Sequence, residues 1–173
     1  MSGTRVTATR AAAFLASLLF ACSPPCVWPS PALLVHKPAP EFARNDIHGQ
    51  RADLASFRGR VVLLTFWATW CAPCQIEMPH FVLWQQELGP QGFQVVAISM
   101  DDDAAPVLSL ARRRHVNYPV IMGDERLGAL YGGVLGLPVT FLINRQGNIA
   151  AIFKGETSLN QMKAQILKLL QSR

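Results

Sequence analysis

Two cysteines separated by only two residues, Cys71 and Cys74, have the type and spacing that most plainly suggest chemistry. Side chains at this spacing can close a small disulfide ring, and a thiolate at one of them can attack a disulfide in another molecule. The alternatives are an inert disulfide or half of a zinc site. A structural zinc site takes four ligands, usually from a second Cys or His pair at close spacing. Because His80 and His115 are single and far apart in the sequence, we expect redox chemistry and no bound metal.

The segments on either side of the cysteines place them at a junction between a strand and a helix. Residues 61–66 form an apolar, β-branched run with the composition of a buried strand. After the cysteines, apolar residues recur with helical spacing as far as Leu88. The pair should therefore lie on the first turn of a helix, where unpaired backbone N–H groups and the positive end of the helix dipole favour a thiolate. This position makes Cys71 the reactive member, with Cys74 one turn later on the same face.

Two separated motifs resemble one protein family. The run Phe66-Trp67-Ala68-Thr69-Trp70-Cys71-Ala72-Pro73-Cys74, followed by Glu77-Met78-Pro79, is similar to the extracytoplasmic TlpA/ResA/CcmG-like thiol–disulfide oxidoreductases of the thioredoxin fold, which are related to the AhpC/TSA redoxins. The run Gly136-Leu137-Pro138-Val139-Thr140-Phe141-Leu142-Ile143 resembles the cis-proline strand of that family. The resemblance covers roughly residues 38–172. It implies an α/β thioredoxin fold, in which helices flank a central mixed β-sheet, with an N-terminal β-hairpin and a central strand–helix insertion.

The rest of the chain contains elements that fit this architecture. Residues 42–53 predict a hairpin around a His48-Gly49 turn, and the apolar runs that follow predict strands over 61–67, 93–100, 118–122, 139–144 and 148–154. Helical patterns cover 73–88, 104–115 and 124–131, and a final helix begins after a capping box made by Ser158 and Gln161. The strand and helix over 118–131 form the expected insertion.

The resemblance also implies a role for each site residue. Cys71 is the nucleophile, exposed to solvent, and Cys74 is the shielded partner that resolves the mixed disulfide. Pro138 is cis and lies beside Cys71, where main-chain groups around Leu137 can pair with a client strand. Trp70 and Pro73 complete this substrate groove, while Trp67 packs beneath it in the core. The redox-active disulfide serves in place of any cofactor.

One position departs from the pattern of cytoplasmic thioredoxins. Six residues before Cys71, where those proteins keep a buried Asp, this chain has Thr65. A hydroxyl cannot act as a carboxylate base for Cys74 at neutral pH. Water or another acid must therefore take the proton, and the nearby acids are Glu77 and Asp101. We expect Glu77 to be a surface group and Asp101 to cap a helix.

The direction of electron flow is inferred from the dipeptide between the cysteines. Ala72-Pro73 carries no cation, and strong oxidants depend on extra stabilisation of the reduced thiolate. We therefore expect a reductant that works in an oxidising compartment and receives electrons from a membrane thiol donor. In the resembling family the clients are disulfides of exported proteins, such as the haem-binding sites of apocytochrome c, so cytochrome c maturation is the expected process.

The first residues indicate export. Residues 1–21 have a basic start and an apolar run of residues 11–21 that is too short to span a bilayer, as in a secretory signal. Leu19-Phe20-Ala21-Cys22 resembles a bacterial lipobox, which would make Cys22 a lipidated tether to the membrane. Cleavage after Ala21 without lipidation, or an uncleaved anchor, are the alternatives. Residues 22–40 are rich in proline and predict a semi-rigid spacer without backbone hydrogen bonds, and residues 41–173 form the thioredoxin-like domain. Cys26 is interpreted as a bystander thiol.

The sequence fits three other functions less well. A thiol peroxidase of the redoxin type needs a Pro-x-x-x-Thr/Ser-x-x-Cys loop, but Leu64 and Ala68 occupy the required positions. A chaperone that delivers metal or haem is the non-enzymatic alternative on the same fold, but its copper-carrying members use a longer cysteine spacing with a distal His, which is absent here. Nucleic-acid binding needs a basic face with aromatic platforms. The formal charge is +5, but the basic residues are scattered apart from residues 112–114, which we expect to end a helix.

Overall fold

The computed structural model describes residues 30–172. The predicted signal segment, residues 1–21, and the predicted lipidation site Cys22 lie outside the described residues, as does Cys26. The fold is therefore that of the predicted domain together with the last part of the predicted linker. Within residues 30–172, no helix is both long enough and apolar enough to cross a membrane.

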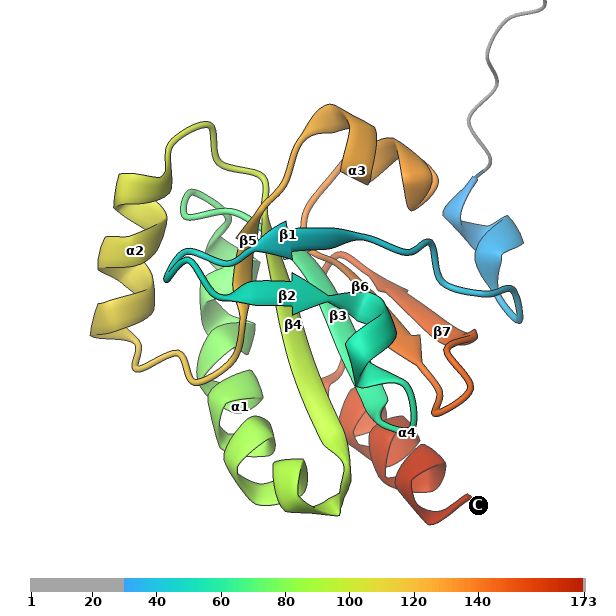
Figure 1. Ribbon diagram of the computed structural model, residues 1–173. Helices are drawn as coiled ribbons and strands as arrows, with labels where there is room; N and C mark the ends of the chain where they lie inside the picture. The colour runs from blue at the N-terminus through green and yellow to red at the C-terminus, as the bar shows by residue number, and fades with distance from the viewer. Residues whose placement is uncertain (1–29, 173) are drawn as a thin grey trace, which may run out of the picture.

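A five-stranded mixed sheet forms the centre of the molecule, in the order β5-β4-β3-β6-β7 (Figure 1). Its strands are β3 (Val61–Trp67), β4 (Phe93–Ser99), β5 (Val120–Met122), β6 (Val139–Ile143) and β7 (Ile149–Lys154). β3 and β4 are parallel, as are β4 and β5, whereas β6 is antiparallel to both of its neighbours. All residues of β3 and β4 are buried, because both faces of the sheet are covered. The predicted central mixed sheet is confirmed.

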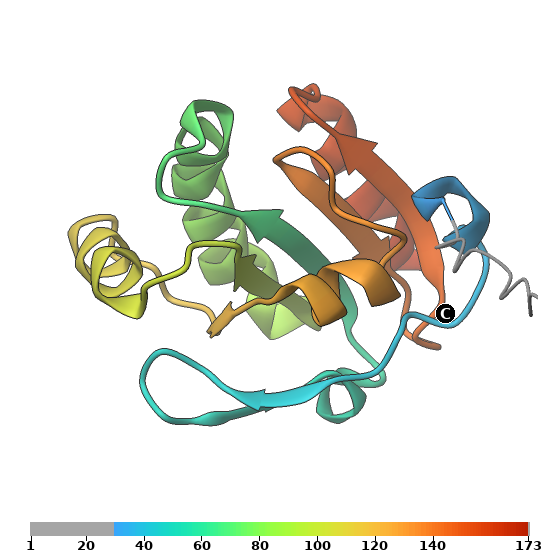
Figure 2. The same cartoon turned by 90° about the horizontal axis from the view of Figure 1, so that it is seen from above.

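One layer covers each face of the sheet (Figure 2). On one face pack the helices α1 (Ala72–Leu88), α2 (Ala104–Arg113) and α4 (Leu159–Gln171). On the other face lie the short helix α3 (Glu125–Leu130) and the hairpin of β1 (Ala43–Asn45) and β2 (Arg51–Asp53). Single turns of 3-10 helix are η1 (Pro31–Leu34), η2 (Leu54–Phe57) and η3 (Gly89–Gln91). The predicted N-terminal hairpin and the inserted strand and helix, β5 and α3, are therefore confirmed.

The alternation of side chains along β3 decides what lies beneath the start of α1. Leu63 and Trp67 belong to the core on the α1 side, whereas Leu64 and Phe66 belong to the core on the hairpin side. Successive side chains of a strand point to opposite faces. Thr65 therefore faces α1, and a polar side chain lies in the core under the first turn of that helix.

The segment before the hairpin pairs with the edge strand of the sheet. The His36 N–H donates to the Ile149 carbonyl at 2.8 Å, and the Ile149 N–H donates to the Lys37 carbonyl at 2.9 Å. Pro38 forms an antiparallel bridge with Asn148. The prediction of a spacer without backbone hydrogen bonds is therefore wrong for residues 36–39. The physical reason is that β7 is an edge strand, whose unpaired main-chain groups accept a neighbour.

Candidate active site

The two cysteines lie at the start of α1 and are joined by a disulfide. Cys71 is the N-cap residue, and its Sγ accepts a hydrogen bond from the Cys74 N–H at 3.3 Å. The sulfur thus pairs with one of the N–H groups that a first turn leaves open. Pro73 lies in the same turn, where its missing N–H leaves no partner unpaired. After reduction, the same N–H and the helix dipole would stabilise a Cys71 thiolate.

Both cysteines are buried in this disulfide form. Cys71 is 5% exposed and Cys74 is 4% exposed. The expected contrast between an exposed first cysteine and a shielded second one is therefore wrong for the oxidised protein, because the N-cap sulfur folds back over the helix start. Trp70, directly before the disulfide, is 71% exposed, whereas Trp67 is buried in the core as predicted.

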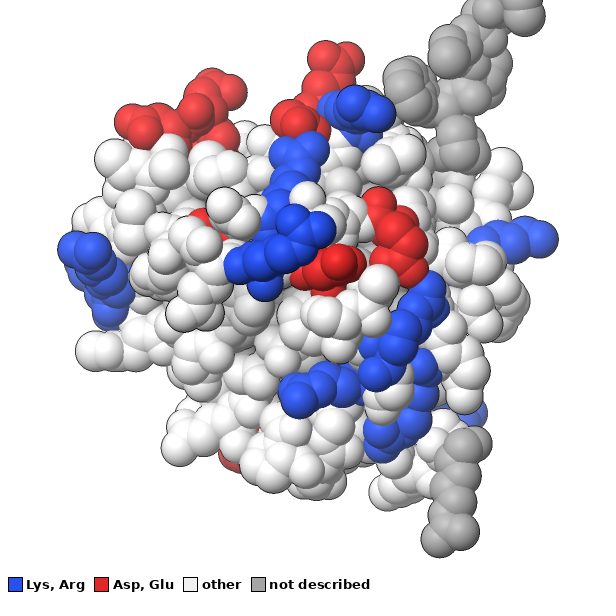
Figure 3. All heavy atoms as spheres, viewed as in Figure 1, with Lys and Arg blue, Asp and Glu red and all other residues white. Residues whose placement is uncertain are grey.

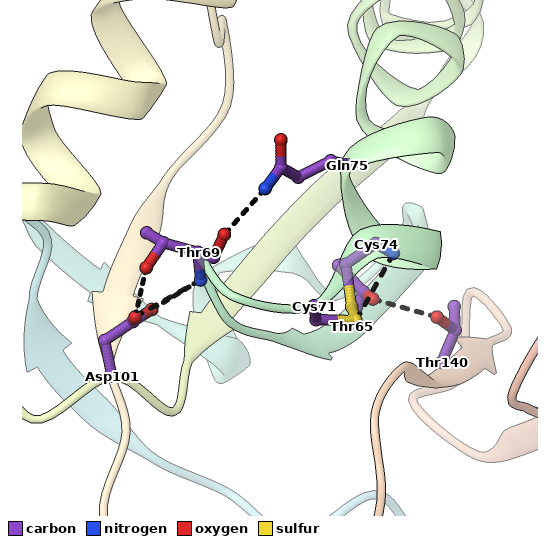
Figure 4. The surroundings of a disulfide bond; sticks show 7 residues. All are labelled: Thr65, Thr69, Cys71, Cys74, Gln75, Asp101 and Thr140. Atoms are coloured by element: carbon purple, nitrogen blue, oxygen red, sulfur yellow. Dashed lines mark hydrogen bonds between the residues drawn. A yellow bond between two sulfur atoms is a disulfide. The ribbon is translucent and has the colours of Figure 1, made fainter.

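A hydrogen-bonded clamp holds the loop that leads into the disulfide (Figure 4). The Asp101 carboxylate, directly after β4, accepts from the main-chain N–H of Thr69 at 2.9 Å and from the Thr69 hydroxyl at 2.5 Å. It also accepts from the Ser99 hydroxyl at 2.7 Å, while the Gln75 side chain donates to the Thr69 carbonyl at 2.6 Å. The prediction that Asp101 caps a helix is wrong, because Asp103 is the N-cap of α2. Asp101 instead fixes the approach to the disulfide.

A pair of buried hydroxyls links β3 and β6 on the α1 side of the sheet (Figure 4). Thr65 and Thr140 face each other in the antiparallel register, and their Oγ1 atoms are 2.9 Å apart. Each hydroxyl therefore satisfies the other, and neither is a carboxylate that could take a proton from Cys74 at neutral pH.

A buried carboxyl lies close to the second cysteine. Glu77 is 5% exposed, and it lines a void of about 10 Å³ together with Cys74, Thr65 and Trp67. Among the described residues, neither Glu77 Oε2 nor Trp67 Nε1 has a hydrogen-bond partner. Burial raises the pKa of Glu77 to about 7, because a low-dielectric environment disfavours the charged form. The prediction that Glu77 is a surface group is wrong, because this residue lies on the buried face of α1.

The second motif, residues 136–143, begins at the end of the sheet where the disulfide lies. The register pairs Phe66 with Val139, so Pro138 lies beside the carboxyl end of β3, from which the disulfide loop departs. The Leu137–Pro138 peptide bond is cis, as predicted. The main-chain groups of Gly136 and Leu137 make no hydrogen bond with residues 30–172. A free donor and a free acceptor are therefore available at the end of the sheet from which the disulfide loop departs, where an extended segment of another chain could pair with them.

The charges on the face drawn in Figure 3 are mixed in sign. Arg44 pairs with Asp124 at 2.7 Å, and Arg58 pairs with Glu41. The basic residues 112–113 lie in the last turn of α2, as predicted. This face shows no continuous basic stripe of the kind that binds nucleic acid. Between residues 30 and 172, no three His, Cys, Asp or Glu side chains are grouped as a metal site requires.

Comparison with known proteins identifies the family. A model described as "AhpC/TSA family" matches residues 35–152. The chain belongs to the AhpC/TSA family. A relative named thiol-disulfide oxidoreductase ResA, from Bacillus thuringiensis subsp. konkukian, is 31% identical over 137 residues, which cover 78% of each chain. Two solved structures from Chlorobium tepidum are also similar. A thiol:disulfide interchange protein of the thioredoxin family has 29% identity and a TM-score of 0.72, and a putative thiol:disulfide interchange protein DsbE has 32% identity and a TM-score of 0.71. Each match covers 77% of this chain and 95% of that one.

These matches confirm the resemblance and the thioredoxin fold, and this AhpC/TSA member is a thiol–disulfide oxidoreductase. The peroxidase loop does not fit the site. Leu64 and Ala68, at the positions where that loop needs a proline and a hydroxyl, are fully buried apolar residues. Sequence reasoning missed the buried carboxyl of Glu77 and the clamp at Asp101, although it named both residues.

Proposed function

We propose that the protein is an extracytoplasmic reductant of disulfides in exported proteins, with cytochrome c maturation as the process it serves. The observation that carries this proposal is the position of Cys71, whose sulfur caps α1 and is bonded to Cys74. A helix start without a neighbouring cation in the motif stabilises the thiolate only moderately, and a moderately stabilised dithiol is a reductant. The redox-active disulfide is the only redox group that the proposal needs.

In the proposed reaction the Cys71 thiolate attacks one sulfur of the client disulfide. The client disulfide breaks, a mixed disulfide forms at Cys71, and the other client sulfur leaves as a thiolate. The Cys74 thiol then gives its proton to the Glu77 carboxylate and attacks Cys71 Sγ. This step closes the Cys71–Cys74 disulfide and releases the second client sulfur, which takes up a proton. A membrane thiol donor returns two electrons, and two protons complete the dithiol.

The proposed groove for the client consists of Trp70, Pro73, Leu137 and Pro138. Trp70 is an exposed apolar side chain next to the disulfide, and the free main-chain groups at Leu137 suit an extended client segment. The predicted signal segment 1–21 and a lipid on Cys22 would export the chain and tether it to the membrane. Replacing Cys22 by Ala should then release the protein from the membrane fraction, and unchanged retention would contradict lipidation.

Substrate trapping tests the reaction and identifies the client. In Cys74→Ser the resolving sulfur is missing, so a mixed disulfide at Cys71 should accumulate on exported proteins that contain cysteine pairs. The double variant Cys71→Ser/Cys74→Ser is the matched control and should trap nothing. Mass spectrometry of the trapped adduct names the client. If the single and double variants recover the same proteins, disulfide exchange at Cys71 is not the function. A reduction potential near that of periplasmic oxidants, about −120 mV, would contradict the proposed direction.

A further inference from the structure

A wide apolar hollow opens beside the cis-proline. It has a volume of about 580 Å³ and is lined by three segments: the start of the described chain at Ser30, the loop of residues 132–139 and the end of β7. This volume lies within the range of sites that bind small molecules or large side chains. Leu135 projects from its wall fully exposed, and glycines line much of the rest. Lys154 is the only charged side chain among the lining residues that the structure describes.

A second, smaller hollow lies between the start of α1 and the residues that follow β7. Its volume is about 220 Å³, and its lining includes Pro73, Ile76 and the largely buried Glu77 of α1 and the exposed Glu156 after β7. Ile76 is 64% exposed. Residues 154–155 line the larger hollow and the next two residues, 156–157, line the smaller one. Both hollows contain residues of the proposed groove, Leu137 and Pro138 in the larger and Pro73 in the smaller. A client segment that lies across Pro73 and Pro138 would contact both hollows.

The two hollows carry opposite charges. Lys154 and Glu156 are both exposed, and neither makes an ion pair or a side-chain hydrogen bond with residues 30–172. A free cation at one hollow and a free anion at the other give the groove a direction. Electrostatic complementarity of this kind contributes more to partner choice than to raw affinity.

We propose that these two hollows select the client by the residues that flank its cysteine. An extended client segment places an apolar side chain in the larger hollow with an acidic residue beside Lys154, and it places a basic residue beside Glu156 on the other side of the cysteine. This inference rests on the proposed function, because the client's sulfur must reach Cys71. It adds a substrate class: disulfides in segments that are apolar and acidic on one side and basic on the other.

Two peptides of identical composition test the charge assignment. Each holds one cysteine as a mixed disulfide with thionitrobenzoate; one has Leu-Glu before the cysteine and Lys after it, and the other has the reverse order. A third peptide with Gln in place of both charges is the reference. The measured quantity is the second-order rate constant for reaction with the fully reduced protein, followed by absorbance of the released thiol. Wild-type protein should prefer one order by roughly threefold to tenfold at low salt, and 0.5 M salt should reduce this ratio.

The charge-swapped variant Lys154→Glu/Glu156→Lys should prefer the opposite order, at unchanged net charge. Lys168→Glu is the control for a charge reversal elsewhere on the surface. Residue 168 lies about 13 Å along α4 from Leu159, which lines the smaller hollow, so this variant should show the same order of preference as wild type. Equal rate constants for both peptides with wild-type and swapped protein would overturn the inference while leaving disulfide reduction intact. If none of the three peptides reacts faster with the reduced protein than with free cysteine, the proposed function fails as well.

The apolar part of the inference has its own test at Gly136. A Cβ at this position meets no atom within 4 Å and the backbone is not left-handed, whereas Gly133 has φ +77° and would be strained. Gly136→Trp should therefore fill the larger hollow without distorting the loop, and Gly136→Ala is the matched control. Wild-type and Gly136→Ala protein should react roughly tenfold faster with a Leu-containing peptide than with its Gly counterpart, and Gly136→Trp should abolish the difference. An unchanged preference in Gly136→Trp would overturn the inference. If, in addition, wild type sedimented as a dimer and Gly136→Trp as a monomer, the larger hollow would instead join two copies of the chain.

Discussion

Glu77 lies one helical turn after Cys74, and both side chains line the void beneath the disulfide. Cys74 must lose a proton before its sulfur can attack Cys71. Because burial raises the pKa of Glu77 to about 7, this carboxyl can accept a proton and release it again near neutral pH. The pair therefore offers the proton path that the hydroxyl of Thr65 cannot provide.

Replacing Glu77 by Gln should slow the resolving step. Gln has the same shape but accepts no proton at these pH values, so release of the client from its mixed disulfide with Cys71 should become at least about tenfold slower at pH 7. The measurement is the lifetime of a preformed mixed disulfide across pH 5–9, read by mass spectrometry after acid quenching. In wild type the release rate should rise through the pKa of Glu77, and the variant should lack that rise. Glu87→Gln changes an exposed glutamate of the same helix and is the matched control. Identical profiles for wild type and Glu77→Gln would exclude the proton path.

The same carboxyl should make the stability of the oxidised protein depend on pH. Its pKa is about 7 in the folded state against a reference value of 4.5, so between these values the folded state binds more protons than the unfolded state. The contribution of Glu77 to the free energy of unfolding should therefore be highest below pH 4.5 and should fall as the pH rises through 7. One pKa unit corresponds to about 1.4 kcal/mol, so wild type should lose roughly 1–3 kcal/mol relative to Glu77→Gln between pH 4.5 and 8. Urea unfolding at several pH values measures the difference. Parallel curves for the two proteins would show that Glu77 does not titrate in this window.

The helical repeat of α1 contains enough information to predict that Glu77 is buried. The first apolar residue after the two cysteines is Ile76, which suggests that the buried face of α1 includes it, but Ile76 is 64% exposed. The buried residues of α1 are Cys74, Glu77, Met78, Phe81, Trp84 and Leu88, a cleaner helical repeat that contains a glutamate. A charged residue is assigned to the solvent face by default because glutamates are seldom fully buried.

Local patterns predicted the order of elements, the hairpin and the capping of α4 by Ser158, and the family resemblance predicted the cis bond before Pro138. They did not predict contacts between distant segments. Asp101 and Thr69 are 32 residues apart in the sequence, and nothing near either residue indicates the other. The pairing of residues 36–39 with β7 was missed for a similar reason, since prolines suggest a solvated spacer and do not reveal an edge strand nearby.

The clamp at Asp101 should be needed to hold the loop before the disulfide. In Asp101→Asn one carboxylate oxygen becomes an amide NH₂, which cannot accept the bonds from Thr69 and Ser99. We expect a loss of about 1–2 kcal/mol in the free energy of unfolding and at least about tenfold faster hydrogen exchange at the Thr69 amide. Asp102→Asn removes the same charge from the exposed neighbouring residue and should change neither quantity. Equal exchange rates in the two variants would show that the loop is held by packing alone.

The hydroxyl pair of Thr65 and Thr140 should behave as a unit in a double-mutant cycle. Their Oγ1 atoms are 2.9 Å apart and buried between β3 and β6, so replacing either residue by the isosteric Val leaves the other hydroxyl unsatisfied. Each single variant should lose about 1–3 kcal/mol of unfolding free energy, whereas the double variant loses both partners and should approach wild-type stability. Urea unfolding of the four proteins gives a coupling energy of roughly 1–3 kcal/mol in favour of the double variant. Strictly additive losses would mean that each hydroxyl finds another partner, such as water in the void next to Thr65. Because Thr65 lines that void with Cys74 and Glu77, the double variant should also raise the pKa of Glu77, since its surroundings lose a polar group.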